Sequence, residues 1–370
     1  MPTMLTARLH QFGAPLSLDR VPVPEPGPTD VLVAVKACSI VPNLRNVLST
    51  DWPALFPHLV RPALPASFGL DAAGIVAAIG SQVLGARPGD RVYVNPGRGC
   101  GTCRPCRAGA IADCRSFTFQ GYFGRGALSQ RIFEHYPCGG LGEYLTAPQS
   151  ALVPLPASVP FEAAARFGYL GTGYSALKKA TVGPASSVLI NAIGGTLGLG
   201  TALLALAMGA TRILGTGRNP ALLERVRALA PGRIAVLSVA DGRPIADWAM
   251  QLTGGAGVDA VIDALPPRAP AAASLDALMA LGQGGRAVDI GAMAEPLVLP
   301  PYWLKATKAT LTGSSWFSTE DGAEMAEMAR AGTLDLSVFE HRRFPLARVN
   351  EAIAGLADGA GGFVNSVVLP

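Results

Sequence analysis

The sequence predicts an α/β protein in which a β-rich N-terminal domain precedes a doubly wound parallel sheet, and the last residues return to mixed character. Three observations support this fold class. The 370 residues suit two domains at the usual ~100 to 200 residues each. Roughly the first 150 residues alternate short apolar runs with Pro and Gly, which is typical of strands. From Ser187 to about Ile290, apolar strand candidates alternate with helical segments, as in parallel sheets.

The N-terminal strands show the alternation expected of strands with one buried face. Val31, Val33 and Val35 alternate in DVLVAVKACSI. The preceding VPVPEPGPTD is too rich in Pro to form a helix. GIVAAIG and RPGDRVYV supply two more short strands. We place this β-rich domain at residues 1–155, where the Pro-spaced connector ALVPLPASVP closes it.

The middle of the chain, residues 156–303, is predicted to form the parallel sheet after an opening helix, FEAAARFGYLGTGYSALKKA. The predicted strands are SVLIN, RILGTG, RIAVLSV, GVDAVIDAL and GRAVDIGAM, with TALLALAMGA and PALLERVRALA among the helices between them. Residues 304–370 are predicted to return to the first domain. This part has helices at Thr319–Ala331 and Leu346–Leu356 and a closing strand, FVNSVVL.

Composition excludes several classes of protein. Charged residues make up 15% and hydrophobic residues 49% of the chain, which rules out a disordered chain. The net charge is +4 without a basic tract, so a nucleic-acid partner is not expected. No secretory leader is visible at the N-terminus, and we expect a cytoplasmic protein. The uncharged run Ala180–Thr211 contains Gly and Pro, so we interpret it as strand, turn and helix without membrane association.

The segment LINAIGGTLGLG follows a predicted strand and opens a predicted helix, which is the context of a dinucleotide-binding turn. The first glycine position of that fingerprint is Ala192. Small residues there let backbone amides meet a pyrophosphate at the helix N-terminus. We predict cofactor contacts at four consecutive positions: Gly194, Gly195, Thr196 and Leu197. The same pattern also occurs in turns that bind no ligand.

The end of the second predicted strand indicates which dinucleotide binds. NAD enzymes carry an acid there for the ribose hydroxyls, but this chain reads Gly217-Arg218-Asn219. Arg218 can pair with a 2′-phosphate through its planar donor fork. This favours NADP(H) and adds Gly217 and Arg218 to the cofactor site. The alternative is that Arg218 is a solvated surface residue.

Four of the six cysteines stand close together as Cys100-x2-Cys103-x2-Cys106-x7-Cys114, interleaved with glycines. Four thiolates suit a closed tetrahedral zinc site, which is structural and has no open coordination position. An iron–sulfur cluster is the alternative, although no Pro follows the last Cys. Disulfides are disfavoured in the expected compartment. We therefore predict one structural Zn²⁺ per chain.

Together these residues resemble the zinc-containing alcohol dehydrogenase branch of the medium-chain dehydrogenase/reductase family. The resemblance covers essentially the whole chain, through PGPTDVLVAVKAC, FGLDAAGIVAAIG, GDRVYV, the four-cysteine lobe, GGLGEYL, LGTGYSAL, the Gly-rich turn and GRAVDIGAM. It implies a GroES-like catalytic domain made from both ends of the chain, a Rossmann domain between them, and an active site in the cleft. It also implies a small-molecule substrate and a homodimer or homotetramer. We add Thr172 and Gly291, from two of these segments, to the cofactor site.

The catalytic zinc site of that family is incomplete in this chain. Its three ligand positions hold Cys38, Leu70 and Gly168, and only Cys38 is a normal ligand. Asp71 fills the slot of a neighbouring Glu and offers one oxygen, which gives two ligands where a catalytic zinc takes three. We therefore predict a structural zinc and no catalytic zinc.

Without a Lewis acid, hydride transfer loses several kcal/mol of charge stabilisation. The family's relay hydroxyl and relay His positions hold Ile40 and Asn43. An activated C=C, C=N or C=O substrate needs less polarisation, so we predict NADP(H)-dependent reduction of such a small organic molecule. Candidate catalytic residues near the cleft are Cys38, Asn43, Asp71 and Tyr169. Each of them also has a purely structural interpretation as a packed or paired side chain.

Two alternatives to this function remain open. One is a zinc-dependent alcohol dehydrogenase or carbonyl reductase with an unusual ligand set. The other is an NADPH-binding pseudo-enzyme. The aromatic, Gly-rich segment Ser116–Gly140 is a candidate for a loop that covers the substrate or contacts another subunit. The strand GRAVDIGAM and the segment Leu297–Leu311 are candidates for a subunit interface.

Overall fold

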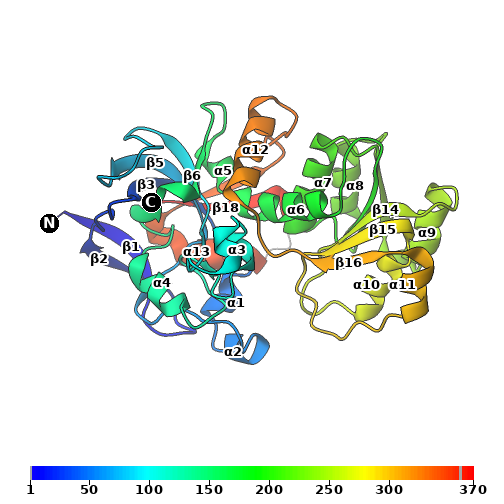
Figure 1. Cartoon of the computed structure of the whole chain (residues 1–370), viewed down its shortest axis with the longest axis horizontal. Coiled ribbons are helices and arrows are strands. Elements are labelled where there is room, and N and C mark those ends of the chain that lie inside the picture. Colours follow the sequence, from blue (N-terminus) through cyan, green and yellow to red (C-terminus); the bar gives the residue numbers. More distant parts are fainter. Residues whose placement is uncertain (1, 358–360) are drawn as a thin grey trace.

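The computed structural model describes residues 2–357 and 361–370. Figure 1 shows two lobes side by side: one holds both ends of the chain, and the other holds the middle. The long helices α6 (Phe167–Lys179) and α12 (Thr319–Arg330) lie between the lobes. The predicted combination of a β-rich domain and a parallel-sheet domain is therefore present.

The first lobe is built on a seven-stranded sheet with the order β10-β6-β5-β3-β18-β17, and β9 pairs with β3 off this path. Strand β18, from the C-terminus, pairs antiparallel with β3, so both ends of the chain build one sheet. The strands of this sheet are β3 (Asp30–Ser39), β5 (Asp71–Ile79), β6 (Arg91–Val94), β9 (Tyr144–Pro148), β10 (Leu152–Pro154), β17 (Glu340–Pro345) and β18 (Val364–Leu369).

Two small sheets and several short helices complete this lobe. The first small sheet has the order β2-β1-β4, and the second pairs β7 with β8. Their strands are β1 (Thr3–Leu9), β2 (Ser17–Pro22), β4 (Ala66–Ser67), β7 (Gly97–Arg98) and β8 (Thr118–Phe119). The helices are α1 (Leu44–Leu48), α2 (Trp52–Leu55), α3 (Arg104–Arg107), α4 (Ser129–His135), α5 (Phe161–Ala164) and α13 (Val349–Ala354).

The second lobe is a six-stranded sheet with the order β13-β12-β11-β14-β15-β16, and every pair in it is parallel. Its strands are β11 (Ser187–Asn191), β12 (Arg212–Gly217), β13 (Ile234–Ser238), β14 (Val258–Asp263), β15 (Leu281–Asp289) and β16 (Thr310–Gly313). Its helices are α7 (Thr196–Ala207), α8 (Pro220–Ala228), α9 (Ile245–Leu252), α10 (Ala271–Leu278) and α11 (Pro301–Thr307). The chain order reverses beside β11, and ligands of doubly wound sheets bind at such a switch point.

Two expectations need correction. The sheet of the second lobe continues through β16 to Gly313, beyond the boundary we expected at residue 303. The helix expected over residues 161–180 is divided into α5 and α6 at Ala165 and Arg166. The break turns Arg166 inward, and this side chain is only 3% exposed.

The uncharged run that could suggest a membrane span is divided as the sequence indicates. Its apolar residues form β11 and α7, and both elements are largely buried in the second lobe. Among the residues that the structure describes, no helix is both long enough and apolar enough to cross a membrane.

Candidate functional site

The Gly-rich turn lies between the end of β11 and the start of α7. Gly195 is the N-cap residue of α7, and Ala192 has a positive φ of 63°, a region that favours glycine. A Cβ on Gly198 would lie 2.3 Å from the carbonyl oxygen of Ala192, so only glycine lets helix and strand approach this closely. The backbone amides at the start of α7 can therefore meet an anion.

The other predicted cofactor residues lie at the same edge of the sheet. Gly217 ends β12 and Arg218 follows it. Arg218 is exposed, and it has no hydrogen bond or ion pair with any residue that the structure describes. Gly291 follows β15, and its N–H donates to Asp289 Oδ1 at 2.8 Å. Because parallel strands end on one edge, the structure brings these groups together around the switch point.

A C-terminal segment of the first lobe lies directly against the Gly-rich turn. The N–H of Gly362 donates to the carbonyl oxygen of Gly194 at 2.9 Å. On its other side, Arg166 Nη2 donates to the carbonyl oxygen of Gly362 at 2.8 Å. Thr172 lies nearby on α6, where it is buried and donates to Gly168 O. Two hydrogen bonds through Gly362 thus link the predicted cofactor turn to Arg166, just before α6.

The four closely spaced cysteines, in the segment that follows β7, form one cluster. The sulfur atoms of Cys100, Cys103, Cys106 and Cys114 all lie within 4.8 Å of one another. A Cβ on Gly99 would lie 2.8 Å from Cys106 Sγ, so glycine is needed to wrap the chain around them. This tight cradle of four thiol groups fits a closed zinc site.

Backbone amides point at these sulfur atoms. The N–H groups of Cys100 and Ser116 both donate to Cys114 Sγ at 3.4 Å. Hydrogen bonds from the Thr102 and Cys103 backbone lower the pKa of Cys100 to about 6. Such donors favour the thiolate form of Cys100 that binds metal, whereas burial raises the pKa of Cys106 to about 12. Among the described residues, this cluster is the only group of three or more His, Cys, Asp or Glu that could hold a metal ion.

The incomplete site around Cys38 is filled by protein atoms. A Cβ on Gly168 would lie 2.2 Å from Asp71 Oδ1, so the Asp71 carboxyl occupies the space of the missing third ligand. Tyr93 Oη donates to the same oxygen at 2.7 Å. The other oxygen, Oδ2, is buried and has no hydrogen-bond partner among the described residues.

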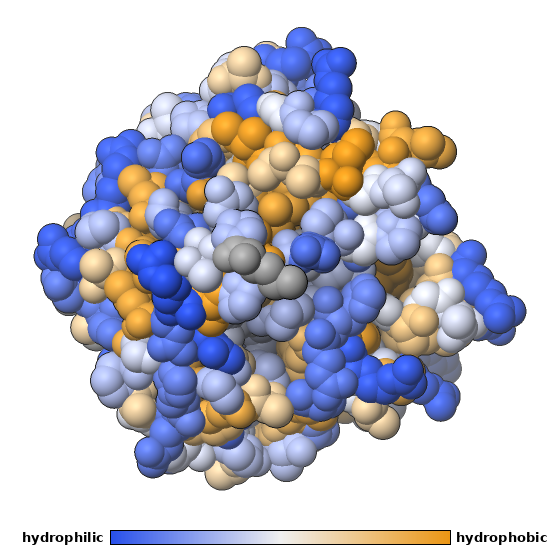
Figure 2. All heavy atoms as spheres, turned by 90° about the vertical axis from the view of Figure 1, so that its left-hand side faces the viewer, coloured by the Kyte–Doolittle hydropathy of each residue, from blue (hydrophilic) through white to orange (hydrophobic). Residues whose placement is uncertain are grey.

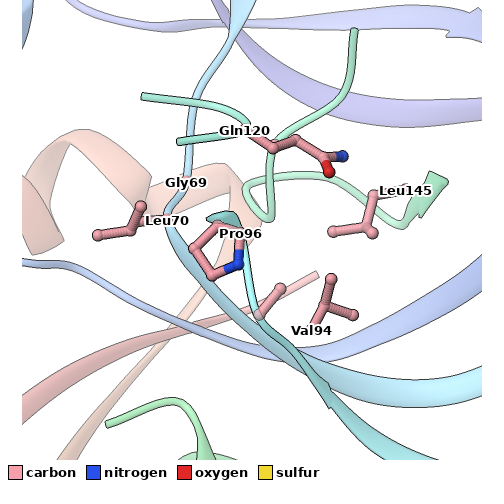
Figure 3. A pocket seen from close by; sticks show the side chains of 8 residues that line it. Gly69, Leu70, Val94, Pro96, Gln120 and Leu145 are labelled. Carbon is pink, nitrogen blue, oxygen red and sulfur yellow. The ribbon is translucent and has the colours of Figure 1, made fainter. Parts of the chain in front are cut away.

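Leu70, at the second ligand position, belongs to an apolar wall. It is 6% exposed and lines a cavity of about 10 Å³, close to the least that one water molecule needs. Figure 3 shows its side chain with those of Pro96, Gln120 and Leu145 around this cavity. The cavity offers no histidine, and it is too small for an organic substrate.

Burial dominates the electrostatics of this cluster. It raises the pKa of Asp71 to about 7, although the Tyr93 hydroxyl, Arg166 and the Gly168 backbone all lower it. Burial, followed by the nearby Asp71, also raises the pKa of the Cys38 thiol far above its usual range. Near neutral pH, the buried Asp71 can therefore be either protonated or ionised.

The remaining predicted catalytic residues, Asn43 and Tyr169, lie together. Tyr169 is half-buried on α6; burial and Asp71 raise the pKa of its hydroxyl, and the Asn43 backbone lowers it. Asn43 precedes α1, and its Oδ1 accepts from Asn46 Nδ2 at 2.9 Å. The structure thus brings all four predicted catalytic residues to one region.

Three further residues belong to this cluster, although their sequence context did not predict a place in it. They are Tyr93, Tyr122 and Arg166. Tyr93 was visible only as one apolar position of a strand, and Arg166 only as part of a helix. Tyr122 lies in the aromatic segment that we expected to cover a site. The one available signal was the presence of Tyr and Arg in segments that are otherwise buried, where such groups require partners.

Comparisons with known proteins agree with this arrangement. The family model described as the alcohol dehydrogenase GroES-like domain matches residues 27–157, and the model described as zinc-binding dehydrogenase matches residues 196–331. The chain belongs to the zinc-type alcohol dehydrogenase family of medium-chain dehydrogenases/reductases. Its first lobe is therefore the GroES-like catalytic domain, and its second lobe is the Rossmann domain.

Individual relatives are more distant. The chain is 35% identical over 195 residues to an alcohol dehydrogenase of Rhizobium meliloti (strain 1021), and it spans only about half of that relative, since the match covers 52% of each chain. It is 27% identical over 355 residues to an NAD-dependent alcohol dehydrogenase of Saccharolobus solfataricus, which covers 95% of this chain and 96% of that one. A protein of Sinorhizobium meliloti 1021 described as a zinc-binding dehydrogenase, solved with NADP bound, shares the fold with a TM-score of 0.82, 24% identity and full coverage of both chains.

Proposed function

We propose that this member of the zinc-type alcohol dehydrogenase family is an NADP(H)-dependent oxidoreductase that acts on an activated C=C, C=N or C=O bond without a catalytic zinc. The observation that carries the proposal is the Asp71 carboxyl, which lies where a third zinc ligand would project from residue 168. With Leu70 at the second position, Cys38 and Asp71 are left as two donors, and a catalytic zinc takes three.

The cofactor assignment rests on the edge of the Rossmann sheet. NADP(H) would be held by Gly194, Gly195, Thr196 and Leu197 at the pyrophosphate and by Gly217 and Arg218 at the adenosine ribose, with Thr172 and Gly291 nearby. The cofactor supplies hydride. An exposed guanidinium without a carboxylate beside it supports a 2′-phosphate, as does NADP in the Sinorhizobium meliloti structure. The NAD-dependent relative favours the other dinucleotide, so binding of both must be measured.

The chain's own residues supply positioning and proton chemistry. The Asn43 amide and the Tyr169 hydroxyl offer donors in the region of Asp71. Asp71, hydrogen-bonded to Tyr93, can hold or release a proton near neutral pH. Cys38 packs beside it as a buried thiol. Buried apolar residues such as Leu70 exclude water, and this strengthens each of these interactions.

A panel of enones, imines and ketones tests the proposal. Purified protein with its metal content measured is mixed with NADPH, and oxidation is followed with and without a chelator. We expect one zinc per chain and turnover that survives removal of loosely bound metal. Two zinc ions per chain with chelator-sensitive activity would instead support the zinc-dependent alcohol dehydrogenase, in which Cys38 and Asp71 are ligands. Cofactor binding with no turnover would support the pseudo-enzyme.

We also propose a cytoplasmic homodimer or homotetramer that acts on small molecules. Strand β16 forms one edge of the Rossmann sheet (Figure 1), and all four of its residues are exposed. Exposed apolar groups lie near it in the sequence: Val298 is 78% and Tyr302 is 75% exposed. Unpaired strand edges readily pair with another chain. The outer face of the catalytic domain instead carries apolar patches interrupted by polar side chains (Figure 2).

A further inference from the structure

The aromatic segment at residues 116–140 contains a buried polar group that the proposed function does not yet use. Tyr122 is 3% exposed, and its hydroxyl has no hydrogen-bond partner among the residues that the structure describes. A buried hydroxyl without a partner costs free energy. Such a group therefore needs an explanation, and a ligand that arrives later is one.

A close crossing of glycine backbones holds Tyr122 beside the candidate site. The N–H of Gly69 donates to the carbonyl oxygen of Gly121 at 3.0 Å, and the N–H of Gly140 donates to Gly69 O at 2.9 Å. Gly121 has a φ of 68°, and a Cβ on it would lie 2.5 Å from Gly139 Cα. Gly121, which precedes Tyr122, is thus fixed against Gly69, which lies two residues before Asp71.

The neighbours of the Tyr122 hydroxyl are the predicted catalytic residues. Burial and then Tyr169 raise the pKa of this hydroxyl well above its usual value, and Asp71 raises it further. The Asn43 side chain, which faces the hydroxyl but lies outside hydrogen-bond geometry, lowers the pKa. The hydroxyl therefore keeps its proton at neutral pH and is available only as a donor or a neutral acceptor. Its ring packs on Phe123 with the ring centroids 4.9 Å apart, which restrains its orientation.

We propose that the Tyr122 hydroxyl donates a hydrogen bond to the substrate's carbonyl oxygen or imine nitrogen, which either belongs to the reduced double bond or is conjugated with a reduced C=C bond. The inference rests on the proposed function, because it assigns this group the polarising role that a catalytic zinc would otherwise fill. A fixed donor in a water-excluded site stabilises developing negative charge without reorganising. The role is non-covalent: the reduction consumes the hydride of NADPH and one proton, which the buried Asp71 can release, and Tyr122 keeps its own proton.

Two matched variants test this role. Tyr136 lies in the same segment, and its hydroxyl donates to Asp30 Oδ1 at 3.1 Å. Tyr136→Phe removes a hydroxyl that has a partner, so it should lower the Tm of the cofactor-free protein and leave kcat within about twofold of wild type. Tyr122→Phe removes a hydroxyl that has no hydrogen-bond partner among the described residues, so it should leave the Tm unchanged or slightly higher. It should nevertheless lower kcat by about 10²- to 10³-fold, as does removal of an oxyanion-hole donor.

A second measurement does not depend on turnover. The best ketone or imine of the panel is titrated into the protein saturated with NADP⁺, which cannot reduce it. Tyr122→Phe should weaken this binding by about tenfold, the value of one lost hydrogen bond, while the Kd for NADP⁺ stays within twofold.

The possible outcomes separate the inference from the function on which it rests. If the wild type turns over substrate without a second zinc and Tyr122→Phe does so equally fast, the inference is wrong and the function stands. A Tyr122→Phe protein with a much lower Tm and weaker NADP⁺ binding would show a structural role and also overturn the inference. A wild type with no turnover, or with a catalytic zinc, overturns both.

Discussion

At the scale of single residues, two departures from the family pattern form one structural change. Gly168 lacks the side chain of a zinc ligand, and Asp71 turns its carboxyl into the space that this leaves. The position of the carboxyl requires glycine at residue 168, because any Cβ there would overlap it. The residues lie far apart in the sequence, so their complementarity becomes visible only in the folded chain.

The buried Asp71 carboxyl predicts a pH-dependent stability. Its pKa is raised from 3.8 to about 7 in the folded protein, so the folded state binds the extra proton between these values and loses stability as pH rises through them. Asp71→Asn should remove this loss, which amounts to about 3 kcal/mol between pH 5 and the folded pKa of about 7 at 1.36 kcal/mol per pKa unit. Urea unfolding at pH 5 and pH 8 measures it.

The control is Asp247→Asn, which removes an exposed carboxylate from α9. We expect Asp247→Asn to leave the pH dependence of the unfolding free energy as it is in wild type. The interpretation of Asp71 fails if Asp71→Asn and wild type lose equal stability between pH 5 and pH 8.

Arg218 predicts the cofactor preference. Arg218→Ala should raise the Kd for NADPH by about 10- to 100-fold, since a hydrogen bond between charged groups contributes roughly 1.5–3 kcal/mol, and should leave the Kd for NADH unchanged. Fluorescence titration measures both constants. Arg212→Ala, at the opposite end of β12, is the matched control. If Arg218→Ala weakens the binding of NADPH and NADH equally, Arg218 does not contact the 2′-phosphate.

At the scale of elements, the strands of the Rossmann sheet were predictable because burial on both faces makes them continuous apolar runs. SVLIN and RILGTG coincide residue for residue with β11 and β12. The division of the helix at residues 161–180 was not predictable, because the break serves contacts of Arg166 with distant groups. Strand β16 was also missed, since its exposed residues carry no apolar pattern.

We infer that bound metal, more than apolar burial, stabilises the folded conformation of the four-cysteine lobe. Within it, α3 has four residues and none of them is buried, so little apolar burial stabilises it. Cys106→Ser should therefore reduce the zinc content from one per chain toward zero and lower the Tm by several degrees. Metal analysis and thermal unfolding measure the two effects.

Two other cysteines serve as controls for the lobe. Cys138→Ala and Cys38→Ala should both leave the zinc content unchanged, because neither belongs to the cluster. A loss of zinc in Cys38→Ala would point to a catalytic metal. Iron in place of zinc would contradict our assignment of the lobe.

At the scale of the whole molecule, the exposed edge of the Rossmann sheet predicts self-association. Leu311 is 38% exposed at the centre of β16. Leu311→Lys should convert the oligomer into smaller species, because charged residues on an edge strand oppose pairing. Light scattering after gel filtration measures the mass. Leu84→Lys, at a residue of the catalytic domain that is 95% exposed, is the control and should keep the wild-type mass; a monomeric wild type would refute the proposed interface.

The sequence by itself determined the class of fold, the strand–turn–helix at the Gly-rich turn and the four-cysteine cluster, because each depends on periodicity or spacing along the chain. That two catalytic zinc ligands are missing is what its resemblance to the family implies. Tertiary structure alone decided that Asp71 fills the place of residue 168, that Gly362 lies on the cofactor turn, and that Tyr122 lies unpaired beside Asn43. Those are contacts between distant segments, and buried polar groups acquire their energies and their pKa values from whatever the fold packs against them.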